Sequence, residues 1–173
     1  FDEKQAPGLY YADLPEAATV EIVEENGKIY KNGPFEKAPL TRLRGNLYQM
    51  GHLETYLLLG EEQPAIYAPG SVIKLCKADG SAVPSEHLLR YEGRYESAEI
   101  ETAYEVTERD GKLYMHHFRE GLSRLYPVAH DRFVADDVCN GAFVQFTRGS
   151  GGTVIGLTLS FGRVQNLPFS KVN

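Results

Sequence analysis

Ser71 and Lys74 match the S-x-x-K pattern, in which a lysine amine activates a serine nucleophile. That chemistry requires a helix, because residues three apart then share a face and their side chains meet. Ser71 instead opens residues 71–76, which are mostly β-branched or aliphatic and favour a strand. Side chains at an odd separation on a strand point to opposite faces. We therefore expect Ser71 not to be a nucleophile.

Two adjacent histidines, His116 and His117, could suggest a metal site. They fall in a predicted strand of residues 112–118, where neighbouring side chains point to opposite faces and cannot share one ion. His52, His87 and His130 lack a ligand spacing to cysteine or carboxylate side chains. We therefore expect no metal site and no cofactor.

Paired carboxylates at residues 24–25, 61–62 and 136–137 could act in acid–base catalysis. Each pair lies near a predicted turn, where solvated acidic side chains are common, so we expect surface positions. Residues 149–152 are glycine-rich but lack the G-K-[ST] of a phosphate-binding loop. We therefore predict no catalytic residues in this chain.

The composition is that of an ordinary globular chain. Its 173 residues carry a net charge of −6, which gives no electrostatic reason to bind nucleic acid or an anionic membrane. The apolar runs are too short to span a bilayer, and no secretory pattern opens the chain, so cytoplasm and periplasm both stay open as locations. Cys76 and Cys139 are too few for a disulfide framework, and we expect them to be free and partly buried. The chain begins at Phe1, as a trimmed terminus or an excised fragment would.

An internal repeat organises the sequence. Residues 20–30 recur as residues 104–114, about 84 positions further on. The two copies centre on Asn26-Gly27 and Asp110-Gly111, dipeptides that favour type I′ hairpin turns because both central residues take positive φ. Two further pairs match in the same order: residues 8–10 with 93–95, and 40–43 with 122–125.

The duplication predicts two domains, an N-terminal β-barrel over residues 1–80 and a C-terminal β-barrel over 91–173. Residues 81–90 are the expected linker, because the stretch before Ser85 is polar and interrupted by glycine and proline. No amphipathic helix of ten residues is evident. Short runs between turns predict eight strands in the second half, which fit an up-and-down barrel. They are residues 92–97, 101–108, 112–118, 122–128, 131–135, 142–148, 153–161 and 163–169.

The clearest alternation is in residues 153–161. It predicts that Ile155, Leu157, Leu159 and Phe161 line one face of the strand. Gly156, Thr158 and Ser160 would lie on the other face. The fold class that these features predict is all-β, with two tandem eight-stranded antiparallel barrels.

The second half also resembles a known family. Residues 91–99 resemble the opening of the C-terminal lipocalin-like barrel of β-lactamase-related serine hydrolases, and the family's usual continuation follows in order over about half the chain. Its further segments are residues 104–114, 125–127, 131–133, 146–148, 152–157 and 162–169. The resemblance implies that the barrels are lipocalin-like.

Two such barrels after a catalytic domain are similar to the layout of D-aminopeptidases. The resemblance implies that the barrels pack on the hydrolase domain and that a loop of the second barrel reaches its active site. The matching segment is residues 135–141, with Asp136, Asp137, Val138, Cys139 and Asn140 as candidate substrate-access residues. The family's catalytic residues belong to a domain that this sequence does not contain, so none is carried over.

The leading hypothesis is a non-catalytic accessory region of such a serine hydrolase, with the catalytic domain as its partner. The alternative is a free-standing carrier of a small ligand, because an eight-stranded barrel either holds one ligand or is filled by its own side chains. An enzyme built on the barrels is a third, less favoured interpretation.

Overall fold

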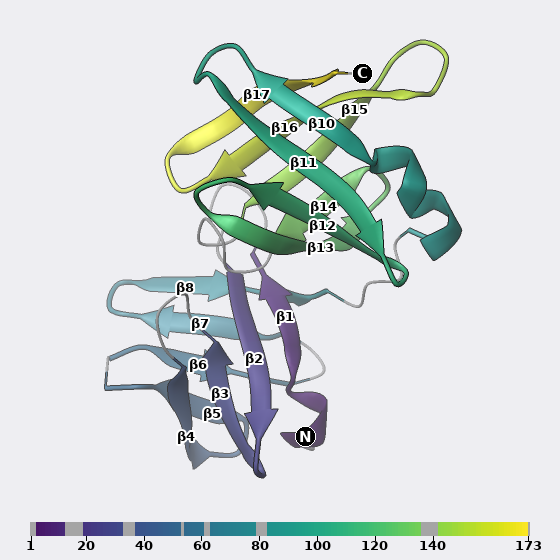
Figure 1. Ribbon diagram of the computed structural model, residues 1–173. Helices are drawn as coiled ribbons and strands as arrows, with labels where there is room; N and C mark the ends of the chain where they lie inside the picture. The colour runs from purple at the N-terminus through teal and green to yellow at the C-terminus, as the bar shows by residue number, and fades with distance from the viewer. Residues whose placement is uncertain are drawn as a thin grey trace. The chain divides into compact units, whose positions relative to one another are not determined.

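The computed structural model describes residues 3–12, 19–32, 37–52, 54–60, 63–78, 83–135 and 142–172. The chain divides into two compact units, Phe1–Ala78 and Asp79–Asn173. Each is an antiparallel barrel-like sheet, as the sequence predicts (Figure 1). In the described ranges, no helix is long and apolar enough to cross a bilayer.

The first unit is a nine-stranded antiparallel sheet in the order β8-β7-β6-β5-β4-β3-β2-β1-β9. Its elements are the 3-10 helix η1 (Glu3–Gln5), β1 (Gly8–Tyr11), β2 (Thr19–Glu25), β3 (Lys28–Asn32), β4 (Ala38–Arg44), β5 (Leu47–Met50), β6 (Tyr56–Leu58), β7 (Ala65–Ala68), β8 (Ser71–Lys74) and β9 (Cys76–Lys77).

The two edge strands of this sheet are consecutive in the chain. Only Leu75 separates β8, which pairs with β7, from β9, which pairs with β1. The backbone N–H of Leu75 bonds the carbonyl of Pro64 at 2.7 Å instead of joining either ladder. Residues 71–77 therefore act as one bent strand that changes partner, and counting them so gives the eight strands predicted for the barrel.

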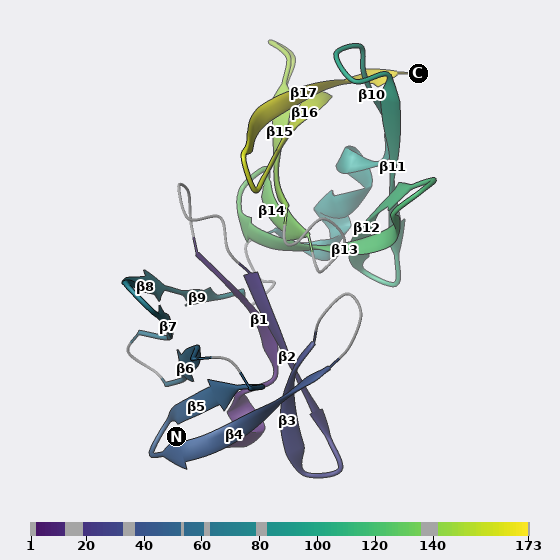
Figure 2. The ribbon, with the colours of Figure 1, turned by 90° about the vertical axis from the view of Figure 1, so that its left-hand side faces the viewer.

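The second unit is a closed eight-stranded barrel, β10 to β17 in chain order (Figure 2). Each strand pairs with its sequence neighbours, and β10 also pairs with β17. The elements are the 3-10 helix η2 (Ser85–Tyr91), β10 (Gly93–Ser97), β11 (Thr102–Arg109), β12 (Lys112–His117), β13 (Gly121–Ala129), β14 (Arg132–Ala135), β15 (Phe143–Arg148), β16 (Val154–Phe161) and β17 (Val164–Val172). All eight strands predicted in this half are confirmed, most of them within one or two residues.

The repeated hairpin forms in both units. Asn26 and Gly27 take φ of 53° and 73°, and Asp110 and Gly111 take 53° and 72°, which are the type I′ values the dipeptides predict. In each turn a glutamate two residues before the dipeptide accepts the glycine's backbone N–H, at 3.1 Å in the first unit and 2.6 Å in the second. The local sequence and the tertiary pairing therefore favour the same turn.

A glycine and a lysine close each unit in the same way. Gly8 opens β1 with φ of 141°, and Gly93 opens β10 with φ of 143°, a region that side chains disfavour. The closing strand lays a lysine over each glycine: a Cβ there would lie 2.8 Å from Cε of Lys77 or 2.6 Å from Cε of Lys171. Burial lowers the pKa of both lysines.

A tyrosine two residues after each glycine completes this closure. Tyr10 donates its hydroxyl hydrogen to the carbonyl of Ala6 at 2.9 Å, and Tyr95 donates to the carbonyl of Tyr91 at 2.6 Å. The lysine ammonium lies 5.5 Å from the Tyr10 ring centroid and 5.8 Å from that of Tyr95. Burial raises the pKa of both phenols, so they stay protonated donors. The same contacts in both halves support the duplication.

Both interiors are occupied by apolar side chains. In the first unit the largest fully buried ones are Tyr48, Ile22, Leu57, Leu59 and Leu75. In the second unit they are Tyr91, Tyr95, Phe133, Leu113, Leu125 and Leu157. Inward-facing side chains alternate with outward ones along the strands, so each unit has its own core.

The alternation predicted for β16 is wrong at one residue. Leu157 and Leu159 are buried at 1% exposure each, as predicted, but Ile155 is 52% exposed. Val154 takes the inward position instead, at 7% exposure. The β15–β16 ladder skips Ile155, and this bulge reverses the faces of the residues before it.

Gly156 marks a close approach of two strands. A Cβ there would lie 2.5 Å from the backbone oxygen of Phe169, which cannot turn aside as a side chain could. We expect Gly156→Ala to lower the free energy of unfolding by about 1–3 kcal/mol through overpacking. Gly151→Ala is the matched control, because a Cβ at Gly151 meets nothing within 4 Å. Equal urea midpoints for the two variants would contradict this expectation.

Two expectations near the boundary differ from the structure. Residues Ser85–Tyr91, within or next to the expected linker, form η2 and place Leu88 and Tyr91 in the core of the second unit. Cys76 is free but exposed, and not partly buried as expected, because it sits on the short pair of β9 with β1. Cys139 lies outside the described residues.

Candidate functional sites

A partly buried ion pair lies at one end of the second barrel. Three elements position it: Tyr91 ends η2, Asp131 sits in the β13–β14 turn with φ of 60°, and Arg148 ends β15. Arg148 donates from Nε to Oδ2 of Asp131 at 2.8 Å and from Nη2 to Oδ1 at 2.7 Å. The Tyr91 hydroxyl donates to Oδ1 of Asp131 at 2.7 Å. Two parallel bonds of this kind fix the orientation of both side chains.

Backbone groups complete this network. The Asp131 carbonyl accepts the backbone N–H of Phe146 at 2.8 Å, and Nη1 of Arg148 donates to the carbonyl of Gly152 at 2.6 Å. The Tyr91 ring packs edge-on against Phe133 at 5.1 Å between centroids. The turn, the helix and two strands are thereby tied together, and we name Tyr91, Asp131 and Arg148 the end clamp.

Electrostatics favour the charged state of the end clamp. Burial alone would raise the pKa of Asp131, but hydrogen bonds from Arg148 and Tyr91 and the charge of Arg148 outweigh it and lower this pKa below its ordinary value. The hydrogen bond to Asp131 raises the pKa of Arg148, and burial with the neighbouring Asp131 raises that of Tyr91. The carboxylate already accepts from both partners, so the end clamp is suited to holding structure together.

A second polar group lies inside the barrel near the β12–β13 turn. Oγ1 of Thr102 is 2.8 Å from Nε2 of His117, and Nδ1 of His117 is 3.8 Å from Oε2 of Glu120. The order Thr–His–Glu is that of a nucleophile, base and acid. Nδ1 also accepts the backbone N–H of Arg119 in a long hydrogen bond of 3.4 Å. The distance from His117 to Glu120 exceeds a hydrogen bond, so the carboxylate does not orient the ring as the acid of a triad would.

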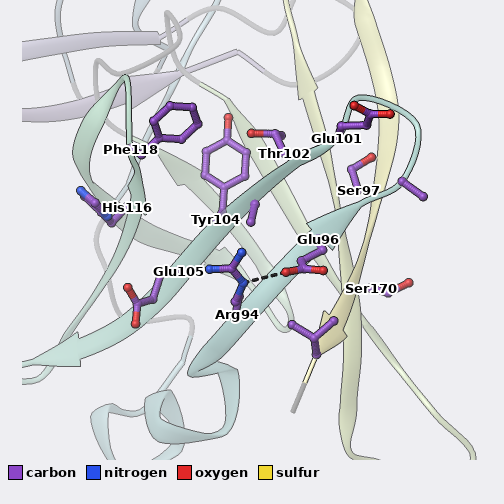
Figure 3. A pocket seen from close by; sticks show the side chains of 13 residues that line it. Arg94, Glu96, Ser97, Glu101, Thr102, Tyr104, Glu105, His116, Phe118 and Ser170 are labelled. Carbon is purple, nitrogen blue, oxygen red and sulfur yellow. Dashed lines mark hydrogen bonds and ion pairs between the residues drawn. The ribbon is translucent and has the colours of Figure 1, made fainter.

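A groove of about 800 Å³ runs over the second unit beside this group (Figure 3). Arg94 and Glu96 lie within it and form an ion pair at 2.7 Å between Nε and Oε1. Glu101 and Glu105 also line it, so its charged groups are mostly acidic. The groove is open and its ion pair is exposed, and such pairs contribute little to stability or binding. Its lining residues are Arg94, Glu96, Ser97, Ala98, Glu101, Thr102, Ala103, Tyr104, Glu105, His116, Phe118, Ser170 and Val172.

The structure places the other sequence candidates as follows. Ser71 and Lys74 lie at the two ends of strand β8, so the strand predicted there is confirmed. His116 is exposed and His117 is buried on β12, which confirms that they face opposite sides. Among the described residues, no three His, Cys, Asp or Glu side chains are arranged to hold a metal ion.

The five predicted substrate-access residues, Asp136 to Asn140, lie outside the described residues. Their neighbours Ala135 and Ala142 are both buried, and the backbone N–H of Ala135 bonds the carbonyl of Ala142 at 2.8 Å. By the up-and-down order of the strands, β14 ends at the same end of the barrel as the β12–β13 turn and opposite the end clamp. The expected loop therefore starts and ends on the side of Thr102 and His117.

Comparison with protein families identifies the second unit. Residues 77–170, more than half of the chain, match a family described as a domain of unknown function, DUF3471. The chain belongs to the DUF3471 family. A search of curated proteins found no match. The match spans the whole DUF3471 barrel up to β17 and leaves most of the first unit outside.

Sequence reasoning did not find the end clamp of the DUF3471 barrel. Asp131 and Arg148 lie 40 and 57 positions after Tyr91 along the chain, so no local sequence pattern joins the three residues. The sequence did contain one indication, because all three residues lie in segments that carry the family resemblance. These segments are residues 91–99, 131–133 and 146–148.

Proposed function

We propose that this chain is a non-catalytic accessory region of a D-aminopeptidase-like or β-lactamase-related serine hydrolase, docking to the catalytic domain and shaping access to its active site. The observation that carries the proposal is the DUF3471 match over residues 77–170, since this domain is known in β-lactamase-related proteins. The ordered motifs of the second half point to the same enzymes.

The end clamp supports an accessory role. Tyr91, Asp131 and Arg148 belong to the segments that carry the resemblance, and in the DUF3471 barrel they bond one another. Residues typical of a family are often its reactive groups, but these three join a helix, a turn and a strand end. Their chemistry is that of a scaffold.

The remaining polar groups favour the same interpretation. Acyl transfer needs a nucleophile, a base and oxyanion donors held within hydrogen-bonding reach. Ser71 and Lys74 occupy a strand, and Nδ1 of His117 lies 3.8 Å from Oε2 of Glu120, beyond hydrogen-bonding distance. These arrangements support placing the chemistry in another domain.

The alternative, a free-standing ligand carrier, has less support. A carrier barrel leaves space between its walls for one ligand. Here inward side chains from all eight strands of the DUF3471 barrel, aromatic ones prominent among them, pack in one cluster. The groove of Figure 3 lies against the wall of the barrel and is open.

The test joins the chain to its catalytic domain. The chain alone should hydrolyse no peptide, ester or β-lactam substrate, with or without Ser71→Ala. In the joined enzyme, deletion of residues 136–140 should change the ratio of kcat/KM for short and long substrates by about tenfold, or ~1.4 kcal/mol of differential transition-state binding. Steady-state kinetics on both substrate lengths measure this ratio.

Arg163→Ala is the control, since it lies in the β16–β17 turn at the same end of the barrel and should leave the ratio unchanged. Labelling of Ser71 by a fluorophosphonate would overturn the non-catalytic assignment. An unchanged ratio after the deletion would remove substrate access from the proposal. If the upstream reading frame encodes no S-x-x-K segment, the assignment of the chain to a serine hydrolase is wrong.

A further inference from the structure

The outer face of the first unit carries two rows of side chains that cross neighbouring strands. Tyr48, Leu57 and Ile66 face the core, so the residues on either side of them in β5, β6 and β7 face outward. The strand register then aligns the outward residues across the sheet. The first row is Arg44, Leu47, Leu58, Ala65 and Lys74, and the second is Thr41, Gln49, Tyr56, Tyr67 and Val72.

The middle of these rows is apolar and, apart from the buried Ala65, at least partly open to solvent. Tyr67 is 38% exposed and Val72 58%, and Leu47, Tyr56 and Leu58 are half-buried. A hollow of about 640 Å³ lies over Leu47, Tyr56, Leu58 and Tyr67. The outward face of an antiparallel sheet is ordinarily polar, and large exposed apolar patches mark interaction sites.

The second unit provides an internal comparison. The first row starts at Arg44 and Leu47, the residue pair that flanks the β4–β5 turn. The equivalent row of the second unit starts at the pair that flanks the β13–β14 turn. That row is Ala129, Arg132, Gln145, Thr158 and Pro168. Its central positions are Arg132, Gln145 and Thr158 where the first unit has Leu47, Leu58 and Ala65. An apolar centre is therefore no requirement of this barrel geometry.

Positive charge flanks the apolar centre on both sides. Arg44 and Lys74 occupy the two ends of the first row, and both are exposed. Within the described part of the chain, neither forms an ion pair. Four strand spacings separate them, or about 19 Å at ~4.8 Å each. In a chain of net charge −6, two unpaired cations at these places form a local positive field.

We infer that this outer face binds another protein, whose own contact surface is apolar and flanked by carboxylates. The face is defined by Leu47, Tyr56, Leu58, Tyr67 and Val72 between Arg44 and Lys74. Aromatic side chains supply contact area at the centre of such an interface, and charges at its rim steer the partner and set its orientation. The inference goes beyond the proposed function, because it identifies a surface of the first unit and the chemistry of what covers it.

Two other occupants fit less well. A second copy packed face to face through this patch would bring Arg44 and Lys74 of one chain towards the same cations of the other, which is repulsive. An anionic membrane would attract the two cations but meets a chain whose net charge is −6. Both remain outcomes of the test.

The experiment places a photo-crosslinker in the full chain. p-Benzoylphenylalanine replaces Tyr67, or Gln145 in the equivalent row of the second unit as the matched control, in the cells that make the protein. After irradiation, mass spectrometry identifies the joined peptide. We expect position 67, and not 145, to join an apolar segment of another protein whose neighbouring surface carries Asp or Glu.

The charges are tested in the same background. Arg44→Glu with Lys74→Glu should lower the cross-link yield at least about tenfold, because like charges would then meet at the rim. In a lysate of the same cells, raising salt to 0.5 M before irradiation should lower the yield of the unchanged chain as well, since exposed charges are screened. Circular dichroism and thermal melting of the double variant check that the first unit remains folded.

Several results would overturn the inference. These are a cross-link within the chain or to a second copy, equal yields at positions 67 and 145, a yield indifferent to the charge reversal, and co-sedimentation with phosphatidylglycerol vesicles that needs Tyr67. A cross-link to a serine hydrolase domain would make this face the docking site of the proposed function. A cross-link to any other protein with flanking carboxylates supports the inference and leaves the proposed function to its own test.

Discussion

Replacing Asp131 with Ala is expected to lower the free energy of unfolding of the second unit by about 1.5–3 kcal/mol, the contribution of hydrogen bonds to a charged group in a partly buried ion pair. The variant leaves the Arg148 guanidinium, whose side chain is 21% exposed, without its bidentate acceptor. The Tyr91 hydroxyl loses its acceptor too. Because the end clamp ties η2 to the β13–β14 turn and the end of β15, one substitution loosens three elements.

Hydrogen exchange followed by mass spectrometry in increasing urea measures this effect for each unit separately. We expect peptides of residues 83–172 to lose protection at lower urea, while those of residues 3–78 keep their midpoint. Glu105→Ala is the control, because it removes an exposed carboxylate from the outer face of β11. Similar midpoints for the two variants would mean that the ion pair contributes no stability.

The pH dependence of stability follows from the lowered pKa of Asp131. A carboxyl whose pKa is lower in the folded chain contributes stability above its unfolded pKa of about 3.9 and loses it as the pH falls through the folded value. The unfolding free energies of the wild type and Asp131→Asn should therefore converge below about pH 4. A difference that does not shrink as the pH falls from 5 to 2 would contradict the linkage.

Truncating Leu157 to Ala should cost about 2–5 kcal/mol, through lost transfer free energy and the cavity left behind. Leu157 is 1% exposed on β16 and belongs to the core of the second barrel. Its cross-strand neighbours Phe146 and Phe169 are large and buried, so the site cannot collapse easily around a missing side chain. Urea denaturation measures the difference.

Thr158→Ala is the matched control for Leu157→Ala. Thr158 is the next residue of the same strand and faces outward, half-buried, so its truncation should fall within about ±0.5 kcal/mol. Equal shifts in urea midpoint for the two variants would show that the strand register is wrong.

Local signals were sufficient where one segment decides its own conformation. The dipeptides Asn26-Gly27 and Asp110-Gly111 predict their turns because positive φ at both residues is a property of the turn itself. The burial of Leu157 and Leu159 follows from the period of a strand. The eight strands of the second barrel rest on signals of this kind.

Local sequence patterns did not predict the structure where residues far away in the chain determine the conformation. Ile155 faces solvent because the pairing of β15 with β16 contains a bulge, which no alternation within β16 reveals. Residues 85–91 were expected to belong mostly to a linker, yet Leu88 and Tyr91 are buried by strands that follow much later in the chain. The break at Leu75 similarly depends on where β1 and β7 lie.

The candidate sites were predictable to a smaller extent. Opposite faces for His116 and His117 follow from the strand, and the structure agrees. The end clamp joins residues of three separate segments, and the row from Arg44 to Lys74 joins five strands, so both appear only when the sheet register is known. The substrate-access assignment of residues 136–140 stays a prediction.

In both units the lysine over the opening glycine comes from the strand made last. A ribosome has supplied every strand of the first unit once Lys77 is made, whereas the second unit lacks its closing strand until residues 164–172 follow. At a synthesis rate of about 5–20 residues per second, the second barrel becomes able to close roughly 5–20 s after the first. From the synthesis of Ser97 until β17 follows, β10 has no partner on one side, and its edge is open to any other strand. Because every strand of the first unit is made before β10, that unit can pair all its strands before the open edge of β10 exists, and the order of synthesis favours pairing within each half.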